Sequence, residues 1–476
     1  MRSKRRRLKL GGVNTPHGYL GPIPEQHRHR DVRSQFWIWA GANIAPINWV
    51  LGALGVTMGL PLWETVAVLL VGNAIGMAIF GYFVVLGQRT GVTGMVLSRA
   101  VFGRKGAYLP AAIQAMLCAG WCAVNTWIVL DLVVTLLQTI GWVGPGTNLV
   151  AVKSAVALAL MVVQVGISWL GYRAITAFER WTVPPTIAIL VIMSAVAWFK
   201  LPVNWAAGIG VHNFWSTEHL SAVTGVMTAI GIGWGITWLT YAGDYSRFIS
   251  ADASPRRLYL ASVSGQSVPV VWLGTLGASL ATISQTTDPG QLIAEAYGSL
   301  AVVILLLVLH GPIATNILNV YTFSVAAKAL DVRLPRQVLA IAVGVVAMGA
   351  VELFVLFGEF GETIDGFLVS VVAWVSPWAA IVVVHWECVA RKRIDAEALD
   401  TPVAATTLPL FRWGALGALL LGMGATWLCL YAPLPWFQGP VASALGGIDL
   451  SWLAGSAVAG GTYWTISRSG EAGIRR

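Results

Sequence analysis

The sequence is poor in charged residues. Asp, Glu, Lys and Arg make up 11% of its 476 residues, whereas hydrophobic residues make up 57%, and the mean hydropathy is +0.72. A soluble domain typically carries about 25% charged residues, so this chain cannot cover a water-facing surface with polar groups. Lipid must be most of its solvent, which excludes a soluble enzyme, a disordered chain and a fibrous protein.

Motifs of catalysis, metal binding and ATP hydrolysis are missing as well. The four cysteines provide neither a disulfide framework nor a CxxC metal pair. The sequence contains no HExxH or DDxxD-type cluster and no Walker-type GxxxxGK[ST] segment. We therefore expect a protein that is not an enzyme, has no cofactor and is not an ATP-driven pump.

The net charge of +9 is concentrated at the N-terminus, where the first 33 residues hold nine Lys and Arg. A basic arm of this kind is typical of a cytoplasmic tail near anionic lipid headgroups, and it does not indicate a nucleic-acid partner. The segment before Gln35 has no apolar core of the kind found in a signal peptide.

Apolar stretches of about 20 residues can cross a bilayer as helices. The sequence predicts twelve such spans, at residues 35–58, 63–86, 107–138, 149–172, 180–199, 221–243, 257–283, 296–327, 336–356, 364–387, 411–431 and 448–467. A membrane β-barrel is excluded because the stretches are too long and do not alternate strictly. Twelve spans without a large soluble domain favour a secondary transporter.

The distribution of Lys and Arg predicts the orientation. With the N-terminus placed in the cytoplasm, 28 of the 30 Lys and Arg fall on the cytoplasmic side, and only Lys153 and Lys200 fall outside. Positive charge is retained on the cytoplasmic side of a membrane. We therefore expect a multi-pass protein of the cytoplasmic (inner) membrane with both termini in the cytoplasm. Of the acidic residues, Asp131, Glu352 and Asp365 fall near outer span ends, where we expect them to be solvated.

Two spans carry backbone-breaking residues at corresponding places. The first contains Gly41, Asn43 and Pro46, and the sixth contains Gly231, Gly233 and Gly235 in the run IGIGWGITW. Helix breaks in matching positions of two halves indicate an inverted repeat with a binding site between the halves. Close helix packing through small residues is the alternative. The predicted parts are a basic tail (1–34), a first repeat (35–200), a second repeat (221–388), two further helices (410–467) and a short C-terminal tail (468–476).

Polar residues line single faces of two spans. In the third span Gln114, Cys118, Trp121 and Asn125 follow helical spacing, and in the eighth Thr315, Asn319 and Thr322 do so, with Asn316 beside them. Buried carboxamides need hydrogen-bond partners, so they either join helices or contact a ligand. An indole face together with amides suits a flat heterocycle, since bases stack on aromatic rings and an Asn can donate and accept together.

Five segments resemble the nucleobase:cation symporter-1 family, and within it the purine–cytosine permease branch. They are TGMVLSRAVFGRKGAYLPA within 87–111, GWCAVNTW (120–127), LGYRAITAFERW (170–181), TWLTYAGDYSRF (237–248) and ATNILNVYT (314–322). The resemblance implies an all-α, five-plus-five inverted-repeat (LeuT-like) core with two extra C-terminal helices. It also implies import of a nucleobase, cytosine or a purine, together with a cation.

Carried over residue by residue, the resemblance makes Trp121 the stacking ring and Asn125 a base-binding amide. It adds to the substrate site the residues Gly41, Asn43, Gly233, Asn316 and Asn319, with either Trp234 or Trp238 as the second aromatic wall. The sequence departs from the branch at Gly41, where a Ser is common, and at Leu318, where a Pro is common. Another flat heterocycle, such as allantoin, a hydantoin, uracil or a thiamine-precursor pyrimidine, is the alternative substrate.

The coupling ion is predicted to be a proton rather than sodium. Sodium-coupled members have two adjacent hydroxyl residues on the eighth span beside first-span carbonyls, and here that pair is Ala314 and Thr315. A sodium site would use Thr315 with the backbone at Ala42, Ala45 and Gly311. A proton needs an ionisable group within the membrane, for which the sequence offers Glu179, Asp244 and His310. Each of the three has a structural alternative, namely an ion pair with a nearby Arg or a bond to backbone freed by Pro312. The oligomeric state is not determined by the sequence.

Overall fold

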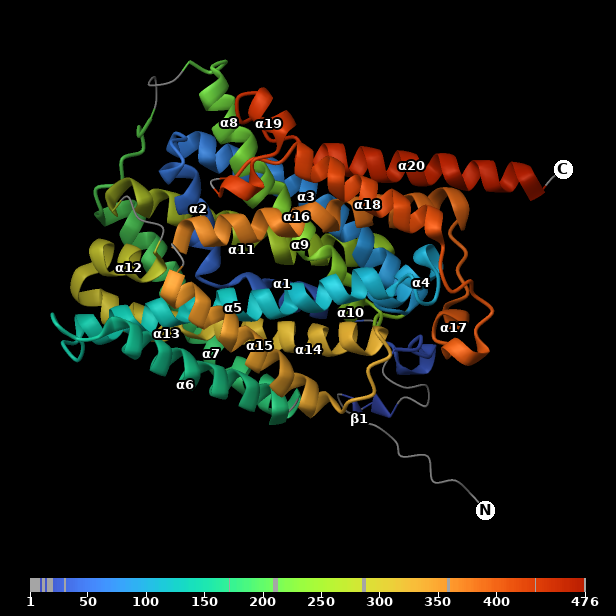
Figure 1. The fold of residues 1–476 in the computed structure, drawn as a ribbon. Coiled ribbons are helices and arrows are strands. Elements are labelled where there is room, and N and C mark those ends of the chain that lie inside the picture. The colour runs from blue at the N-terminus through green and yellow to red at the C-terminus, as the bar shows by residue number, and fades with distance from the viewer. Residues whose placement is uncertain are drawn as a thin grey trace.

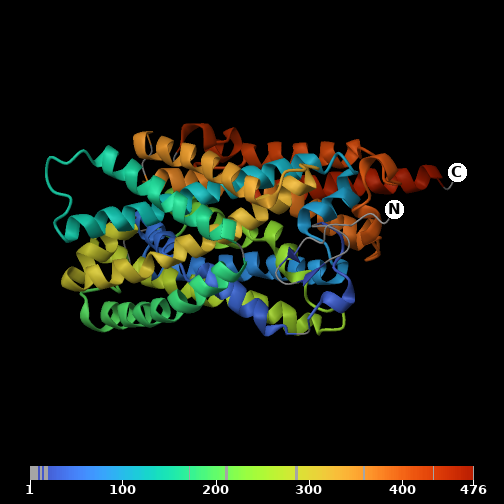
Figure 2. The ribbon, with the colours of Figure 1, turned by 90° about the horizontal axis from the view of Figure 1, so that it is seen from below.

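A computed structural model describes residues 9–10, 13–14, 20–29, 31–170, 172–208, 213–284, 288–357, 360–432 and 434–474. Side chains are described within these ranges except at 9–14, 170–180, 183, 230–231, 360–365 and 470–474. Apart from the two-residue strands β1 (Lys9–Leu10) and β2 (Val13–Asn14), the described elements are helices. They run side by side in one bundle (Figures 1 and 2).

Helices occur along all twelve predicted stretches. In the first half they are α1 (Arg33–Asn43), α2 (Ile47–Thr57), α3 (Leu62–Thr90), α4 (Gly94–Phe102), α5 (Tyr108–Thr139), α6 (Leu149–Leu170) and α7 (Tyr172–Lys200). In the second half they are α8 (Thr217–Val226), η2 (Met227–Ile232), α9 (Gly233–Thr237), α10 (Leu239–Ser246), α11 (Pro255–Ser284), α12 (Pro289–Tyr297), α13 (Ala301–Val308), α14 (His310–Ala329), α15 (Arg336–Phe357), α16 (Phe360–Val384) and η4 (His385–Val389). The C-terminal part adds α17 (Ala396–Leu399), α18 (Trp413–Leu428), α19 (Pro440–Ala444) and α20 (Ser451–Ile474).

Eight helical stretches among the described residues are long and apolar enough to cross a bilayer. They are Leu62–Thr90, Tyr108–Thr139, Leu149–Trp169, Thr217–Ser246, Pro255–Ser284, Pro289–Ala329, Arg336–Phe357 and Gly366–Val389. Three shorter apolar helices, Ile47–Thr57, Pro184–Lys200 and Trp413–Leu428, lie within other predicted spans. The number of twelve spans therefore stays a prediction, while the all-helical membrane architecture is confirmed.

Helices in corresponding places of the two halves pack against each other. The most extensive contacts include those of α3 with α11 and of α5 with α14, which are the second and third spans of the first half with the second and third spans of the other half. Helices α18 and α20 pack on each other and on α16, and α20 runs along the edge of the bundle in Figure 1. Helices α18 and α20 are thus an addition to the core, in agreement with the predicted fold class.

The predicted break in the first span is present between α1 and α2. Helix α1 ends at Asn43, α2 begins at Ile47, and Pro46 precedes it. Proline cannot continue the hydrogen-bond ladder of a preceding helix. Helix α2 lies backbone to backbone on α11: a Cβ added to Gly52 would lie 1.8 Å from the carbonyl oxygen of Gly274, and one added to Gly277 would lie 1.9 Å from that of Trp49. The break is therefore fixed between tightly packed neighbours.

The sixth span is interrupted by a π-helix and a turn and not by an unwound segment. Its backbone passes from α8 into the π-helix η2, then into α9, and departs from α-geometry again at Trp238 before α10. A π-turn is often found at functional sites. Gly233 follows the π-segment, where an added Cβ would lie 2.2 Å from the Thr228 carbonyl oxygen. Gly235 instead packs against Gly76 of α3, so its role is the close helix approach.

Asp131, which was expected to be solvated, is buried inside the bundle. Its Oδ1 lies 3.2 Å from Nζ of Lys153 on α6, and its side chain is 5% exposed. A buried carboxylate requires such a partner, and the pair also accounts for a lysine on the predicted outer side. Glu352 is partly buried and accepts a hydrogen bond from Ser154 at 2.7 Å, while the side chain of Asp365 lies outside the described residues.

An arginine cluster joins the short helix α4 to the ends of α14 and α17. Arg99 donates to the backbone oxygens of Leu399 at 2.8 Å and Ala329 at 3.0 Å. Arg104 binds both carboxylate oxygens of Asp331, at 2.9 and 3.1 Å. Burial acts to raise the pKa of Asp331, but hydrogen bonds from Arg104 and Tyr108 and the two arginine charges outweigh it, so the pKa of Asp331 is lowered.

We expect Asp331→Asn to destabilise the folded protein by about 2 kcal/mol at neutral pH. Removing one partner leaves two buried guanidinium groups without their carboxylate, although Asp331 itself is partly exposed, which reduces the loss. Because the folded-state pKa is lowered, the contribution is complete above the ordinary pKa of about 4 and is lost as pH falls through the folded-state value. Thermal denaturation at a series of pH values between 7 and 3 measures it.

The control for this prediction is Glu397→Gln, at an exposed position on the neighbouring α17. The wild type and the control should denature alike throughout the series. A difference between wild type and Asp331→Asn that stayed constant down to the lowest pH would contradict the assignment to this ion pair.

Candidate functional site

Three aromatic side chains from three helices, Trp121, Trp234 and Phe367, meet in one ring cluster. The Trp121 ring of α5 lies edge to face with Trp234 of α9, at 5.5 Å between ring centroids, and with Phe367 of α16, at 5.0 Å. Trp238 lies 6.3 Å from Trp234. Trp121 is buried, at 4% exposure, so this predicted ring faces the interior of the bundle and not the lipid.

The two candidates for the second aromatic wall have different neighbours. Trp234 contacts Trp121 directly, whereas Trp238 packs edge-on against Trp39, at 5.7 Å, and tilted against Tyr241, at 5.2 Å. The sequence spacing left both open, because residues four apart share a helical face. The ring contacts distinguish the two residues, since Trp234 meets Trp121 and Trp238 meets Trp39 and Tyr241.

Several polar atoms on the buried face of α5 and at Trp238 have no hydrogen-bond partner among the described residues. Asn125, one turn after Trp121, donates from Nδ2 to the backbone oxygen of Trp121 at 2.9 Å, while its buried Oδ1 accepts from no described residue. The indole Nε1 atoms of Trp121 and Trp238 and Oε1 of Gln114 are likewise buried and bonded to no described residue. Buried polar atoms favour being bonded, so these donors and acceptors can bind a polar ligand.

Asn43 joins the first break to the sixth and seventh spans. Its Oδ1 accepts from Nε1 of Trp234 at 2.9 Å, and its Nδ2 donates to Oε1 of Gln266 on α11 at 2.6 Å and to the Trp39 backbone oxygen at 2.8 Å. Asn43 therefore holds Trp234 in place, and its amide is already engaged. Gly41 lies two residues earlier, and a Cβ added there would meet no atom within 4 Å.

A chain of side-chain hydrogen bonds runs from α5 through α10 and α14 to α6. Cys118 Sγ lies 3.4 Å from the hydroxyl of Tyr241, which donates to Asn319 Oδ1 at 3.1 Å. Asn319 donates to Asn316 Oδ1 at 3.3 Å, and Asn316 donates to Gln164 Oε1 at 2.8 Å. The amide of Asn316 also bonds to α5. Of the two predicted amides, Asn316 is held between helices, whereas Asn319 is placed beside Tyr241.

The residues of the predicted cation region also come together. Thr315 Oγ1 lies 3.3 Å from the Ala42 carbonyl oxygen and 3.0 Å from that of Gly311. Gly311 lies directly on the first-span break, since an added Cβ would be 2.9 Å from Cα of Ala45 and 3.0 Å from the Ile44 carbonyl oxygen. Only one side-chain hydroxyl, that of Thr315, enters this contact, because Ala314 contributes none.

The three ionisable candidates differ in their surroundings. Asp244 of α10 is buried, at 2% exposure, beside Arg247 and Thr322 of α14, and its Oδ2 accepts no hydrogen bond from a described residue. His310 is buried at the start of α14, next to Gly311 at the first-span break. The side chain of Glu179 lies outside the described residues.

Four residues of this region carried no signal in the sequence. Phe367 covers Trp121, Tyr241 reaches Asn319, Gln266 holds Asn43, and Gln164 ends the hydrogen-bond chain. Tyr241 lies within the segment TWLTYAGDYSRF, but nothing in that segment indicates its contact with Asn319. The other three come from spans without a polar face and become visible only through their contacts.

The family of the chain follows from its sequence matches. Residues 22–455 match the family described as "Permease for cytosine/purines, uracil, thiamine, allantoin", so the chain belongs to this family of membrane permeases. It is similar to "Putative purine-cytosine permease YxlA" of Bacillus subtilis (strain 168), with 26% identity over 94% of both chains. It is also similar to the purine-cytosine permease FCY2 of Saccharomyces cerevisiae, with 26% identity over 69% of this chain and 63% of that permease.

Solved structures show the same fold. Mhp1, described as a nucleobase-cation-symport-1 family transporter in a closed conformation with bromovinylhydantoin bound, has a TM-score of 0.74 and 18% identity, over 96% of this chain and 95% of that one. Mhp1 in an inward-facing conformation has the same TM-score at 17% identity. The predicted fold class and the resemblance to the nucleobase:cation symporter-1 family are confirmed.

Proposed function

We propose that this permease imports a nucleobase, cytosine or a purine, across the cytoplasmic membrane by symport with a proton. The observation that carries the proposal is the coincidence of the Trp121 ring with the unpartnered Oδ1 of Asn125, one turn along the same buried face of α5. A planar base offers a ring to stack and an edge N–H to donate. Relatives named purine-cytosine permeases support the substrate class.

In the proposed complex the base stacks on the indole face of Trp121, with Trp234 as the second wall. Asn125 Oδ1 accepts from the base, and Asn125 Nδ2 can exchange its bond to the Trp121 carbonyl for a base acceptor. Asn319, joined to Tyr241, completes the polar edge. The half-buried Phe367 lies against the indole, so its ring must move aside for a base to stack there.

Asn43 and Asn316 have structural roles in this proposal. The amide oxygen of Asn43 accepts from Trp234 and its amide nitrogen donates to Gln266. The amide of Asn316 forms hydrogen bonds that connect α14 to α5 and α6. They shape the site without touching the base. Gly41 contributes open space beside the first-span break, where a larger residue would narrow the pocket.

We propose a proton because the sodium region has too few oxygens and a buried acid is at hand. Thr315 alone supplies a hydroxyl near Ala42 and Gly311. Asp244 is one turn from Tyr241 on α10, and Thr322 is one turn from Asn319 on α14. The carboxylate therefore lies one turn beyond the proposed base contacts, where its protonation and base binding can influence each other.

Transport then proceeds by alternating access between the two repeats around this fixed site. A bound base and proton shift the equilibrium only by their different affinities for the outward and inward states. The termini and the inner mouth face the cytoplasm in this proposal, as the distribution of Lys and Arg predicts.

Purified protein in liposomes tests the substrate and the ion together. We expect labelled cytosine, adenine or hypoxanthine to accumulate under an inward proton gradient at equal sodium on both sides. Uracil and allantoin should enter more slowly. Empty liposomes are the control for leak.

Two results would overturn this assignment. Accumulation of allantoin or a hydantoin while cytosine and the purines are excluded would favour the alternative substrate class, which the family description also includes. A requirement for a sodium gradient at fixed pH would move the coupling site from Asp244 to the Thr315 region.

A further inference from the structure

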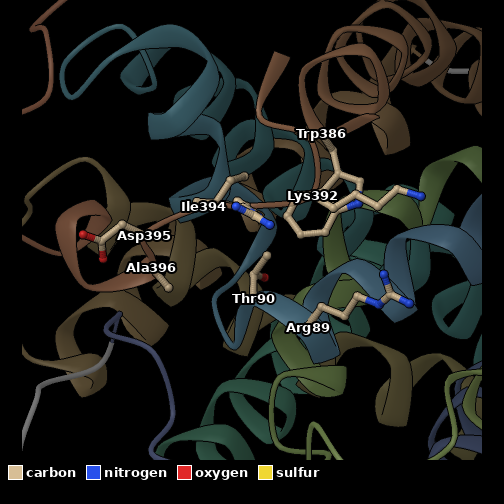
Figure 3. A pocket seen from close by; sticks show the side chains of 8 residues that line it. Arg89, Thr90, Trp386, Lys392, Ile394, Asp395 and Ala396 are labelled. Atoms are coloured by element: carbon tan, nitrogen blue, oxygen red, sulfur yellow. The ribbon is translucent and has the colours of Figure 1, made fainter. Parts of the chain in front are cut away.

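A cavity of about 630 Å³ opens away from the ring cluster, where α3, η4 and the segment after η4 meet. Figure 3 shows its lining side chains, which are Arg89, Thr90, Trp386, Lys392, Arg393, Ile394, Asp395 and Ala396. It shares no residue with the proposed base site, and the nucleobase proposal assigns it no role. By the distribution of Lys and Arg it lies on the cytoplasmic side.

The cavity carries an excess of positive charge. Lys392 pairs with Glu387 at 3.0 Å, and Glu387 also accepts from Tyr82 at 2.8 Å. Asp395 does not neutralise the remaining cations, because its carboxylate caps α17 by accepting from the backbone of Glu397 and Ala398, and in Figure 3 it is turned away from Arg89.

Two cations remain without a carboxylate partner. Arg89 and Arg393 are exposed, and neither forms an ion pair with any carboxylate of the described side chains. Both line the same cavity. Glu387 acts on Arg89 only through space, since its carboxylate is bound by Lys392 and Tyr82. An anion entering the cavity would therefore meet two exposed guanidinium groups that no carboxylate of the described side chains binds directly.

The backbone after η4 is held in a conformation that cationic residues rarely adopt. Arg391 and Lys392 have φ values of 48° and 63°, and the turn is closed by bonds from Ala390 N to the His385 oxygen at 2.7 Å and from Lys392 N to the Trp386 oxygen at 2.8 Å. Glycine usually occupies such helix ends, since the Cβ of any other residue crowds the backbone in the left-handed conformation. The cationic side chains are present despite this crowding.

The inner wall of the cavity is apolar and lies at the end of membrane helices. Trp386 is buried, at 6% exposure, within the last turns of the span Gly366–Val389, and Arg89 ends the span Leu62–Thr90. Tryptophan at a span end marks the headgroup level of the bilayer. An apolar floor under a cationic rim suits a molecule with a phosphate attached to hydrocarbon, and basic pockets of this kind between membrane helices bind anionic headgroups.

We propose that this cavity binds the headgroup phosphate of an anionic phospholipid of the inner leaflet, through Arg89 and Arg393. The bound lipid joins the end of α3 to the end of α16, two helices from different repeats. Two guanidinium groups would bind free phosphate in the same way. The position of the cavity at the ends of the membrane spans, and the Trp386 ring at its inner wall, favour the lipid.

The test measures lipid binding to the full-length protein in neutral detergent. Purified wild type is titrated with a short-chain phosphatidylglycerol, and the rise in melting temperature gives the apparent affinity. Arg89→Gln/Arg393→Gln should bind about 25-fold more weakly, since each cation near an anionic headgroup is worth about 1 kcal/mol, or about fivefold. The matched control is Arg256→Gln/Arg257→Gln, two exposed cations at the start of α11; it should bind as the wild type does.

Phosphatidylcholine and inorganic phosphate complete the design. Neither should reproduce the rise produced by phosphatidylglycerol in the wild type. The proposal is overturned if phosphatidylglycerol does not stabilise the wild type, if the control pair loses the effect equally, or if phosphate alone reproduces it. If Arg89→Gln/Arg393→Gln is poorly folded, Arg89→Gln and Arg393→Gln are titrated singly. Each should bind about fivefold more weakly, and unchanged binding by both would overturn the proposal.

Discussion

Trp121→Ala should abolish uptake while leaving the protein folded and present in the membrane. Stacking of a base on an aromatic ring contributes about 1–3 kcal/mol, which corresponds to a loss of affinity of about 5- to 150-fold. The loss should be in substrate binding, because Trp121 contacts rings of α9 and α16 at the proposed site. Binding of labelled cytosine or adenine to purified protein measures it.

A matched control is available on the same helix. Trp127 is six residues further along α5 and equally buried, but it stacks on Phe354 of α15 at 5.1 Å. Trp127→Ala removes a side chain of the same size from a site without a proposed ligand. It should lower thermal stability, by about 3–5 kcal/mol for a large buried side chain, and should leave the affinity of the folded fraction unchanged.

The variant Trp121→Phe tests whether an aromatic ring at this position is enough for binding. Trp121→Phe keeps an aromatic face and should retain part of the affinity that Trp121→Ala loses. Unchanged substrate affinity in folded Trp121→Ala protein would show that the base binds elsewhere. Equal loss of stability in Trp121→Ala and Trp127→Ala, with the affinity of the folded fraction unchanged in both, would make Trp121 a packing residue.

Asp244→Asn should separate transport from its driving force. The substitution keeps the shape of the buried side chain beside Arg247 and Thr322 but removes the group that takes up a proton. Uptake driven by a pH gradient should fall to the level of empty liposomes. Exchange of internal unlabelled base for external labelled base needs no net proton movement and should continue.

Asp131→Asn is the matched control for Asp244→Asn. It also neutralises a buried carboxylate, but one paired with Lys153 away from the base contacts. Accumulation under a pH gradient should persist in this variant at whatever level of folded protein remains. Gradient-driven accumulation by Asp244→Asn would contradict the role of Asp244, and so would a folded Asp244→Asn protein that has lost exchange as well.

The polar faces were predicted correctly as faces, because helical periodicity decides which residues share a side. Gln114, Cys118, Trp121 and Asn125 are all buried on α5, as their spacing predicts. Periodicity does not say what lies opposite a face. Asn43 and Asn316 resembled ligand contacts in sequence, yet their partners come from residues 223 and 152 positions away along the chain.

The acidic residues show the same limit. The position of Asp131 near a predicted span end suggested exposure to water, but its carboxylate is buried and forms an ion pair with Lys153 of the next helix. Hydropathy describes one segment at a time, whereas an ion pair depends on how two segments pack. Asp244 could be placed at the end of the sixth span, but its place beside Thr322 of the eighth span could not be predicted.

By itself the sequence determined that the protein lies in lipid and is helical, because each segment that crosses a membrane must satisfy its own backbone hydrogen bonds. It also determined the break at Pro46, because proline interrupts the hydrogen bonds of a helix. Only the tertiary structure decided that Trp234 rather than Trp238 meets Trp121, that Phe367 covers the indole, and which amides already have partners. These depend on contacts between distant segments, which local composition and periodicity do not specify.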